Sequence, residues 1–419
     1  MILVPFLTLL HLFAFVCPEI VTAFIIQRHG DRMPYHQIQS LPPFENIGQL
    51  VQKGANRLEH LGKQIKERYN ETLLSDLEYE DQEYAFYATY SERAKMSAQA
   101  FARGLFPPGT GPVDPETGEP IFNQLQQLVP IDSCLGDKEY MLLGATACPK
   151  GMRIINTRQN NHANRLIYKP NKDLISKLAT QTKNSVNGLE ILDVIDSLLS
   201  LHALGLDLPQ GMTENDLEKY KKLFDETFLY YFPTSDPDLC NASLGMFANY
   251  LYTSLDKKPS QRLKLHYFNG HDYSLVPMLG CLGVNLTENV GYASMVVIEI
   301  HKRTNGPTDV DGLDLEFYHA LHPSDTEPLK LERFYPKQCP AEICNMRSFI
   351  VNFPHARDSS PSEWFYSKCG FVTPLNNVWF LVGTILAASL LAVGAIAFLA
   401  SVLYCLHNLY RRKTDWKIN

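Results

Sequence analysis

Two arginines flank a histidine near the start of the chain, and this spacing suits chemistry on a phosphate group. Arg28, His29 and Arg32 follow the apolar run 24–26, which predicts a buried strand that ends in a polar, glycine-containing turn. Guanidiniums offer planar pairs of donors that fit a tetrahedral oxyanion, and an imidazole between them can attack phosphorus. The alternative is a solvated basic turn in which the histidine has no chemical role.

A second polar turn follows another apolar run far downstream. Residues 263–268 predict a buried strand, Asn269-Gly270 a turn, and His271-Asp272 the start of a segment with apolar side chains at helical spacing. An imidazole beside a carboxyl at a strand end suits charge stabilisation paired with proton donation. A lone His-Asp pair is weak as a signal, but two strand-end turns with complementary chemistry rarely coincide by chance.

Together these turns resemble the site of the histidine acid phosphatases, a branch of the histidine phosphatase superfamily. The RHGxRxP signature of that family reads here as residues 28–34, and the second half of the site reads as His271-Asp272. The resemblance extends from Phe24 to about Gly370. Further similar stretches are Gln52-Lys53-Gly54, Met96-Ser97-Ala98-Gln99-Ala100 and Gly104-Leu105-Phe106-Pro107-Pro108.

The resemblance implies a two-step hydrolysis of phosphate monoesters that needs no metal and no other cofactor. His29 would attack phosphorus and form a phosphohistidine, Asp272 would protonate the leaving alcohol, and water would then release phosphate. Arg28, Arg32 and His271 would bind the phosphoryl oxygens. Phosphoryl transfer depends mainly on positioning and electrostatic stabilisation, which such residues supply. If Asp272 must keep its proton beside an anionic substrate, we expect an acidic pH optimum.

One position departs from the family pattern. The family carries a further phosphate-binding arginine upstream of its Met-Ser-Ala stretch, and alignment on Arg93 and Met96 places Tyr87 there. A phenol offers one neutral donor instead of a charged fork, and losing such a contact costs on the order of 10²–10³ in rate. We therefore expect a slower phosphatase that Tyr87→Arg would accelerate, unless Arg93 or Arg103 takes over the role.

Two other functions stay open at this point. The Tyr87 substitution also fits a catalytically degraded ectodomain that acts as a binding protein. A related enzyme that acts on sugar phosphates or inositol phosphates, with its cap setting specificity, is the third possibility. The retained nucleophile and acid favour catalysis, because a pure binding protein has no need for both.

Both ends of the chain predict membrane targeting. Residues 1–23 are apolar and end in Val21-Thr22-Ala23, which fits a signal peptide cleaved after Ala23. Residues 378–406 carry no charge and are long enough to span a bilayer, and basic residues in the tail 407–419 follow them. The pattern predicts a single-pass type I protein whose ectodomain faces the lysosomal lumen or the cell exterior.

The charge of the chain argues against one class of partner. Its formal net charge is −7, and the basic tail leaves the ectodomain still more acidic. An acidic ectodomain is unsuited to nucleic acid, whose binding depends on neutralising phosphates. We expect a phosphomonoester substrate and a membrane attachment, and the family resemblance also suggests a homodimer.

The cysteines indicate an oxidising compartment. Of nine, Cys17 lies in the predicted signal peptide and Cys405 at the membrane end, which leaves an odd number in the ectodomain. The family resemblance suggests the disulfides Cys148–Cys369 and Cys339–Cys344. We expect Cys281, in an apolar run, to be a buried free thiol, which pairs Cys134 with Cys240 by elimination. Predicted glycosylation sites are Asn70, Asn241 and Asn285.

Strand and helix patterns alternate along the ectodomain and predict an α/β fold. The resemblance implies a phosphoglycerate-mutase-like core with a largely parallel sheet flanked by helices, together with a smaller helical cap. We place the core at 24–110 and 241–350 and a mostly helical cap at 111–240. Residues 351–377 then form a stalk that leads to the transmembrane helix.

Overall fold

A computed structural model describes residues 19–75, 78–122, 124–133, 139–188, 190–339, 342–353, 369–370 and 374–415. The chain divides into two compact units, residues 1–369 and residues 370–419. The first unit contains the sheet and the candidate site. The predicted signal peptide up to residue 18, the tail from 416 and most of the predicted stalk lie outside the described residues.

An eight-stranded mixed sheet runs through the first unit in the order β3-β2-β4-β1-β5-β6-β7, with β8 paired to β6. The strands β3, β2, β4 and β1 are parallel, whereas β5 to β8 pair in antiparallel fashion. The predicted largely parallel sheet is therefore correct only for the half that carries the site. The strands are β1 (Glu19–Arg28), β2 (Tyr84–Ala88), β3 (Asp132–Ser133), β4 (Leu265–Gly270), β5 (Met295–Lys302), β6 (Leu313–Ala320), β7 (Glu332–Phe334) and β8 (Cys344–Asn345).

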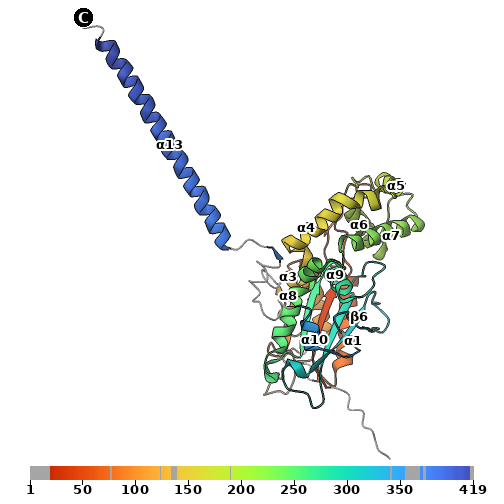
Figure 1. Cartoon of the computed structure of the whole chain (residues 1–419). Helices are drawn as coiled ribbons and strands as arrows, with labels where there is room; N and C mark the ends of the chain where they lie inside the picture. Colours follow the sequence, from red (N-terminus) through yellow and green to blue (C-terminus); the bar gives the residue numbers. More distant parts are fainter. Residues whose placement is uncertain are drawn as a thin grey trace, which may run out of the picture. The chain divides into compact units, whose positions relative to one another are not determined.

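Helices flank this sheet and extend beyond it. The helices α4 to α7 lie together at one end of the unit (Figure 1). In the described residues the helices are α1 (Gln52–Tyr69), α2 (Glu92–Leu105), α3 (Glu139–Leu143), α4 (Pro149–Thr157), α5 (Lys172–Thr182), α6 (Glu190–Ala203), α7 (Glu214–Tyr231), α8 (Pro237–Leu255), α9 (Asp272–Leu282) and α10 (Met346–Ile350), with a π-helix at Arg158–Tyr168 and short 3-10 turns at Gly144–Thr146, Pro259–Gln261 and Val310–Gly312.

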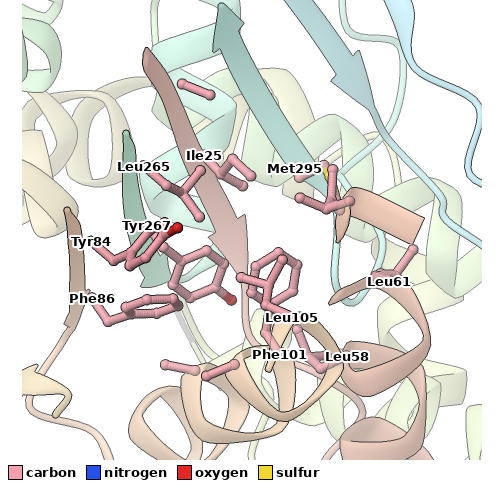
Figure 2. Packing of buried hydrophobic residues seen from close by; sticks show 14 of the residues in the cluster. Ile25, Leu58, Leu61, Tyr84, Phe86, Phe101, Leu105, Leu265, Tyr267 and Met295 are labelled. Carbon is pink, nitrogen blue, oxygen red and sulfur yellow. The ribbon is translucent and has the colours of Figure 1, made fainter. Parts of the chain in front are cut away.

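The hydrophobic core fills both faces of the parallel half of the sheet, because these strands are buried on both sides. On one face α1 and α2 pack against aromatic side chains, where the Tyr267 ring stacks 4.3 Å from Phe101 and lies 5.4 Å from Phe86 (Figure 2). On the other face Phe247 of α8 meets the edges of Phe24 and Phe268. The ends of the central strands are thus held rigidly from both sides.

Close backbone contact fixes the turn that follows β1. A Cβ atom on Gly30 would lie 2.7 Å from the carbonyl oxygen of Gly54, and one on Gly54 would lie 2.3 Å from that of Asp31. No side chain fits at either position, which explains both glycines. The Gly30 amide also donates to Ser97 Oγ of α2 at 3.1 Å. The turn is therefore clamped between the first turn of α1 and the side of α2.

The predicted domain boundaries differ from the arrangement of the elements. Strand β3, inside the range predicted as cap, pairs with β2 at the edge of the sheet, and α8 starts before residue 240 and packs on the sheet. Strand β1 begins at Glu19, and Ala23 pairs with Leu265 at its centre. Cleavage after Ala23 would thus remove residues 19–23 from a buried strand, and it stays a prediction.

The second unit contains one long helix, α13 (Pro374–Asp415). Residues Leu381–Leu406 of this helix are long and apolar enough to cross a membrane, with a mean hydropathy of 2.5. The structure therefore contains a helix that fits the predicted membrane span within 378–406. Cys405 is a free, exposed cysteine in it.

Two disulfides in the structure are the predicted ones, and a third shows that one predicted pair was wrong. Cys148 bonds to Cys369, and Cys339 bonds to Cys344, as the family resemblance implies. Cys281 is bonded to Cys240, so it is not a free thiol, and the predicted Cys134–Cys240 pair is wrong. The packing of α8 against α9 brings these two cysteines together. Cys134 lies outside the described residues.

The three predicted glycosylation sites are accessible to different extents. Asn70, at the end of α1, and Asn285, in the loop after α9, are exposed, and Asn241 in the first turn of α8 is half-buried. Glycosylation at each stays a prediction.

The Cys240–Cys281 bond should be detectable in peptides from the oxidised protein. Proteolysis without reduction should release a cross-linked pair that contains Cys240 and Cys281, identified by mass spectrometry before and after reduction. The bond closes a sequence separation of 41 residues. Cys281→Ser should therefore lower the free energy of unfolding by about 3–4 kcal/mol. A peptide that links Cys134 to Cys240 would contradict the structure.

Candidate active site

The parallel pairing of β1 with β4 brings the two sequence motifs together. Arg28 lies opposite Gly270 in the register, so the turns after both strands leave the same edge of the sheet. The His29 amide donates to the Gly270 carbonyl at 3.0 Å, which continues the pairing into the turn. The rings of His29 and His271 lie 5.3 Å apart. The predicted juxtaposition of the two strand ends is present in the structure.

His29 is held in one tautomer and kept neutral. Its Nδ1 atom lies 2.9 Å from the carbonyl oxygen of Gly30, which can only accept, so Nδ1 carries the proton and Nε2 bears the lone pair. The side chain is 3% exposed. Burial lowers the pKa of the imidazole well below its ordinary value, and His271 and the nearby guanidiniums act in the same direction. A neutral imidazole with a free Nε2 is the form that can attack phosphorus.

Three guanidiniums line the site, and each has a partner. Arg28 pairs with Asp272 at 2.8 Å, and Arg32 pairs with Asp196 of α6 at 2.7 Å. Arg93, in the first turn of α2, lies 3.4 Å from Nδ1 of His271. Such pairing is what allows buried charges to persist, and a bound anion would join guanidiniums that are already in place.

His271 and Asp272 start helix α9. Thr89 Oγ1 lies 2.9 Å from Nε2 of His271, and burial lowers the pKa of this imidazole to about 3, so it is neutral. The Asp272 carboxylate accepts from the amide of Tyr273 at 2.8 Å and from Asn289 Nδ2 at 3.3 Å.

Asp272 is ionised when no substrate is bound. Burial is the largest influence on its pKa and acts to raise it. The Arg28 guanidinium and the other positive neighbours outweigh burial, so the pKa lies below its ordinary value. Asp272 is therefore an ionised carboxylate here, and a bound anion would raise its pKa toward the protonated form that an acid role requires.

A cavity of about 330 Å³ joins these groups to the cap. At its inner end lie Arg28, His29, Arg32, Arg93, His271 and Asp272. Its outer wall comes from α6 and α7. The cavity is large enough for a phosphoryl group and a small leaving group.

Tyr87 lies away from this cavity. Its ring stacks on Phe268 at 5.1 Å and meets Tyr250 of α8 at 5.9 Å, on the other face of the sheet from α1 and α2. Arg93 lines the cavity, whereas Arg103, farther along α2, pairs with Glu59. Of these two arginines only Arg93 lines the cavity, so Arg93 is the one placed to contact a bound phosphate.

Several residues of the site had no signal in the sequence. The Tyr292 ring lies under Arg28, with 4.6 Å from ring centroid to Cζ, and its hydroxyl lies 2.8 Å from Ser200 Oγ. Ser200 Oγ also accepts from Arg32 Nη1 at 3.3 Å. Asp196 and Ser200 stand four residues apart on one face of α6, a spacing that an amphipathic helix shows without any function.

One other cluster contains potential metal ligands. Glu299, His301 and Glu316 bring one ligand atom each within 4.8 Å of one another. Arg68 already pairs with Glu299 at 2.7 Å, and Arg333 pairs with Glu316 at 2.9 Å. Two guanidiniums compensate the two carboxylates, so the cluster is better described as an ion-pair network than as a metal centre.

The fold and the site define a phosphomonoesterase of the histidine phosphatase type. The sequence profile of the histidine phosphatase superfamily (branch 2) matches residues 45–311, and the chain belongs to this family. Lysosomal acid phosphatase of Bos taurus is 26% identical over 302 residues, which is 68% of this chain and 68% of that protein. Testicular acid phosphatase of Mus musculus is 24% identical over 387 residues, or 88% of each.

Solved structures support the fold assignment. The phytase of Citrobacter braakii superposes with a TM-score of 0.57 at 14% identity, covering 81% of this chain and 98% of that one. The phytase of Klebsiella sp. ASR1 gives a TM-score of 0.58 at 15% identity, covering 82% and 97%. At such low identity these likenesses establish the architecture only.

The different positions of Tyr87 and Arg93 lead to a test on the full-length protein in detergent. Arg93→Met should lower kcat/KM for an aryl phosphate about 10²-fold, because it removes one charged donor from the cavity. Tyr87→Arg should give no gain in rate and should lower Tm, since it buries a guanidinium among aromatic rings.

Arg103→Met on the same helix is the matched control. Its guanidinium is half-exposed and pairs with Glu59, so kcat/KM should stay within about twofold of the wild type. A faster Tyr87→Arg variant would show that Tyr87 limits the rate after all.

Proposed function

We propose that this protein is an acid phosphatase that hydrolyses phosphate monoesters through a phosphohistidine at His29. The observation that carries the proposal is the state of His29: buried, neutral, fixed through Nδ1, and surrounded by the guanidiniums of Arg28, Arg32 and Arg93. A nucleophile with these properties, beside donors that match phosphoryl oxygens, is what in-line phosphoryl transfer needs.

In the first step Nε2 of His29 bonds to phosphorus while the bond from phosphorus to the leaving oxygen breaks. Asp272 transfers its proton to that oxygen, and the guanidiniums and His271 neutralise the charge on the other oxygens. In the second step water attacks the phosphohistidine, the Asp272 carboxylate accepts a proton from this water, and inorganic phosphate leaves with His29 neutral again.

The pKa shifts of His29 and Asp272 suit phosphate ester hydrolysis at acidic pH. His29 stays neutral in acid because burial lowers its pKa. Asp272 is ionised in the free site because Arg28 and the other cations offset its burial. A bound phosphate competes for Arg28 and adds negative charge, which raises the pKa of Asp272 so that acid can protonate it.

The alternative of a degraded binding ectodomain was based on Tyr87. Because Tyr87 lies outside the cavity and Arg93 lines it, that substitution no longer argues for loss of activity. We further propose a type I orientation, supported by Arg411 and Arg412 just after the span Leu381–Leu406, with the catalytic unit in the lysosomal lumen or at the cell surface. A homodimer stays a prediction.

Trapping the intermediate tests the nucleophile directly. Full-length protein, incubated with a phosphate ester labelled in its phosphoryl group and quenched in alkali, should carry acid-labile label on the peptide that contains His29. His29→Ala should show neither the label nor turnover. Label on another residue, or turnover by the mutant, would refute the role of His29.

The pH profile tests the acid. When the wild-type protein hydrolyses an alkyl phosphate, the rate should fall as pH rises through the pKa of Asp272 in the substrate-bound protein. The deprotonated carboxylate cannot protonate the leaving alcohol. Asp272→Asn should remove this alkaline limb and slow alkyl esters about 10²–10⁴-fold. Aryl esters, whose leaving group needs less protonation, should be slowed much less. Equal losses for both ester types would argue against general acid catalysis by Asp272.

A further inference from the structure

The outer half of the cavity differs in character from the inner half. Away from His29, the cavity is lined by Leu192 and Asp193 of α6, by Phe224 and Phe228 of α7, and by Tyr273 of α9. The rings of Phe224 and Phe228 stack at 5.7 Å. This wall offers aromatic faces and a carboxylate, whereas the inner half offers guanidiniums.

Two of the three guanidiniums that line the cavity are paired with carboxylates before any substrate enters. Arg28 is paired with Asp272 and Arg32 with Asp196, while the third guanidinium lies next to His271 at the inner end. A single phosphoryl group draws on these cations. A second phosphate on the leaving group would meet no further cation among the described residues that line the cavity, and it would face Asp193 instead.

Asp193 is the one lining carboxylate that is exposed and that no ion pair among the described residues engages. It stands one helical turn from Asp196 on α6, at the cap end of the cavity. A carboxylate beside aromatic faces repels anions and attracts cations, because ring faces carry negative electrostatic potential. Its exposure leaves it available to an incoming substrate.

We propose that Asp193 and the aromatic wall act as a charge filter that selects phosphate monoesters with an apolar, cationic leaving group and rejects polyphosphorylated substrates. This inference rests on the proposed phosphatase function and names its substrate class. It also separates the chain from the phytases whose fold it shares, one of which has been solved with myo-inositol hexakis sulphate.

The test compares phenyl phosphates that differ only in their para substituent: hydrogen, aminomethyl or carboxylate, with inositol hexakisphosphate as a further substrate. The full-length protein would be assayed at about pH 7, because burial raises the pKa of Asp193 above that of an ordinary aspartate. Wild-type kcat/KM should favour the aminomethyl over the carboxylate ester. In Asp193→Asn this ratio should shrink by about three- to tenfold, and in Asp193→Lys it should shrink further, with measurable gain on inositol hexakisphosphate.

Asp207→Asn is the matched control, because it removes the same charge from an exposed loop outside the cavity. Asp207→Asn should leave the ratio of kcat/KM for the aminomethyl ester to that for the carboxylate ester unchanged. Comparing this ratio in each variant with the wild-type ratio cancels differences in leaving-group chemistry. A ratio that is identical in wild type and Asp193→Asn overturns the filter. If the wild type does not hydrolyse unsubstituted phenyl phosphate at all, the proposed phosphatase function is overturned instead, so the two failures are distinguishable.

Discussion

The site depends on the parallel pairing of β1 with β4. Both strands are buried along nearly their whole length, and their register continues through the hydrogen bond from His29 to Gly270. A shift of one residue would turn the side chains of either strand to the opposite face of the sheet. The fixed register therefore sets the distance between His29 and His271. The close backbone contacts at Gly30 and Gly54 then fix the conformation of the turn after β1.

Burying so many charges in one cavity requires compensation from the cap. Arg32 pairs with Asp196, and the Tyr292 hydroxyl contacts Ser200, so α6 holds one guanidinium of the cavity and the ring on which Arg28 lies. A buried guanidinium without a partner would carry a large desolvation cost. The cap is thus part of the electrostatic balance of the site as well as the wall that meets the leaving group.

Sequence reasoning succeeded where short-range pattern decides the outcome. The apolar runs before Arg28 and before His271 predicted two strand ends, and the known geometry of parallel strands predicted that these ends meet. It failed where tertiary packing decides. The Cys240–Cys281 bond depends on how α8 crosses α9, and the antiparallel half of the sheet depends on how β5 returns beside β1. Neither the α8–α9 packing nor the β5–β1 pairing produces a periodic pattern in the sequence.

The positions of Tyr87 and Arg93 show the same limit at the site itself. Alignment by sequence places Tyr87 where a guanidinium is expected, because it counts residues and ignores the direction of each side chain. In the structure Tyr87 turns toward α8, while Arg93, just inside α2, turns toward His271. The end of β2 and the start of α2 are close in sequence, but their side chains point in different directions, and residue counting alone does not distinguish them.

A chain of contacts also ties the acid to the second cap helix. Lys221 and Asp225 form an ion pair on α7, Asp225 accepts from the backbone amide of Asn289, and the side chain of Asn289 donates to Asp272. Since Asn289 can donate to the ionised carboxylate but gains little from a protonated one, this contact favours the resting, ionised state. In the mechanism proposed above, a bound phosphate has to compete with both Arg28 and Asn289 before Asp272 is protonated, which would link proton transfer to the arrival of a phosphate in the cavity.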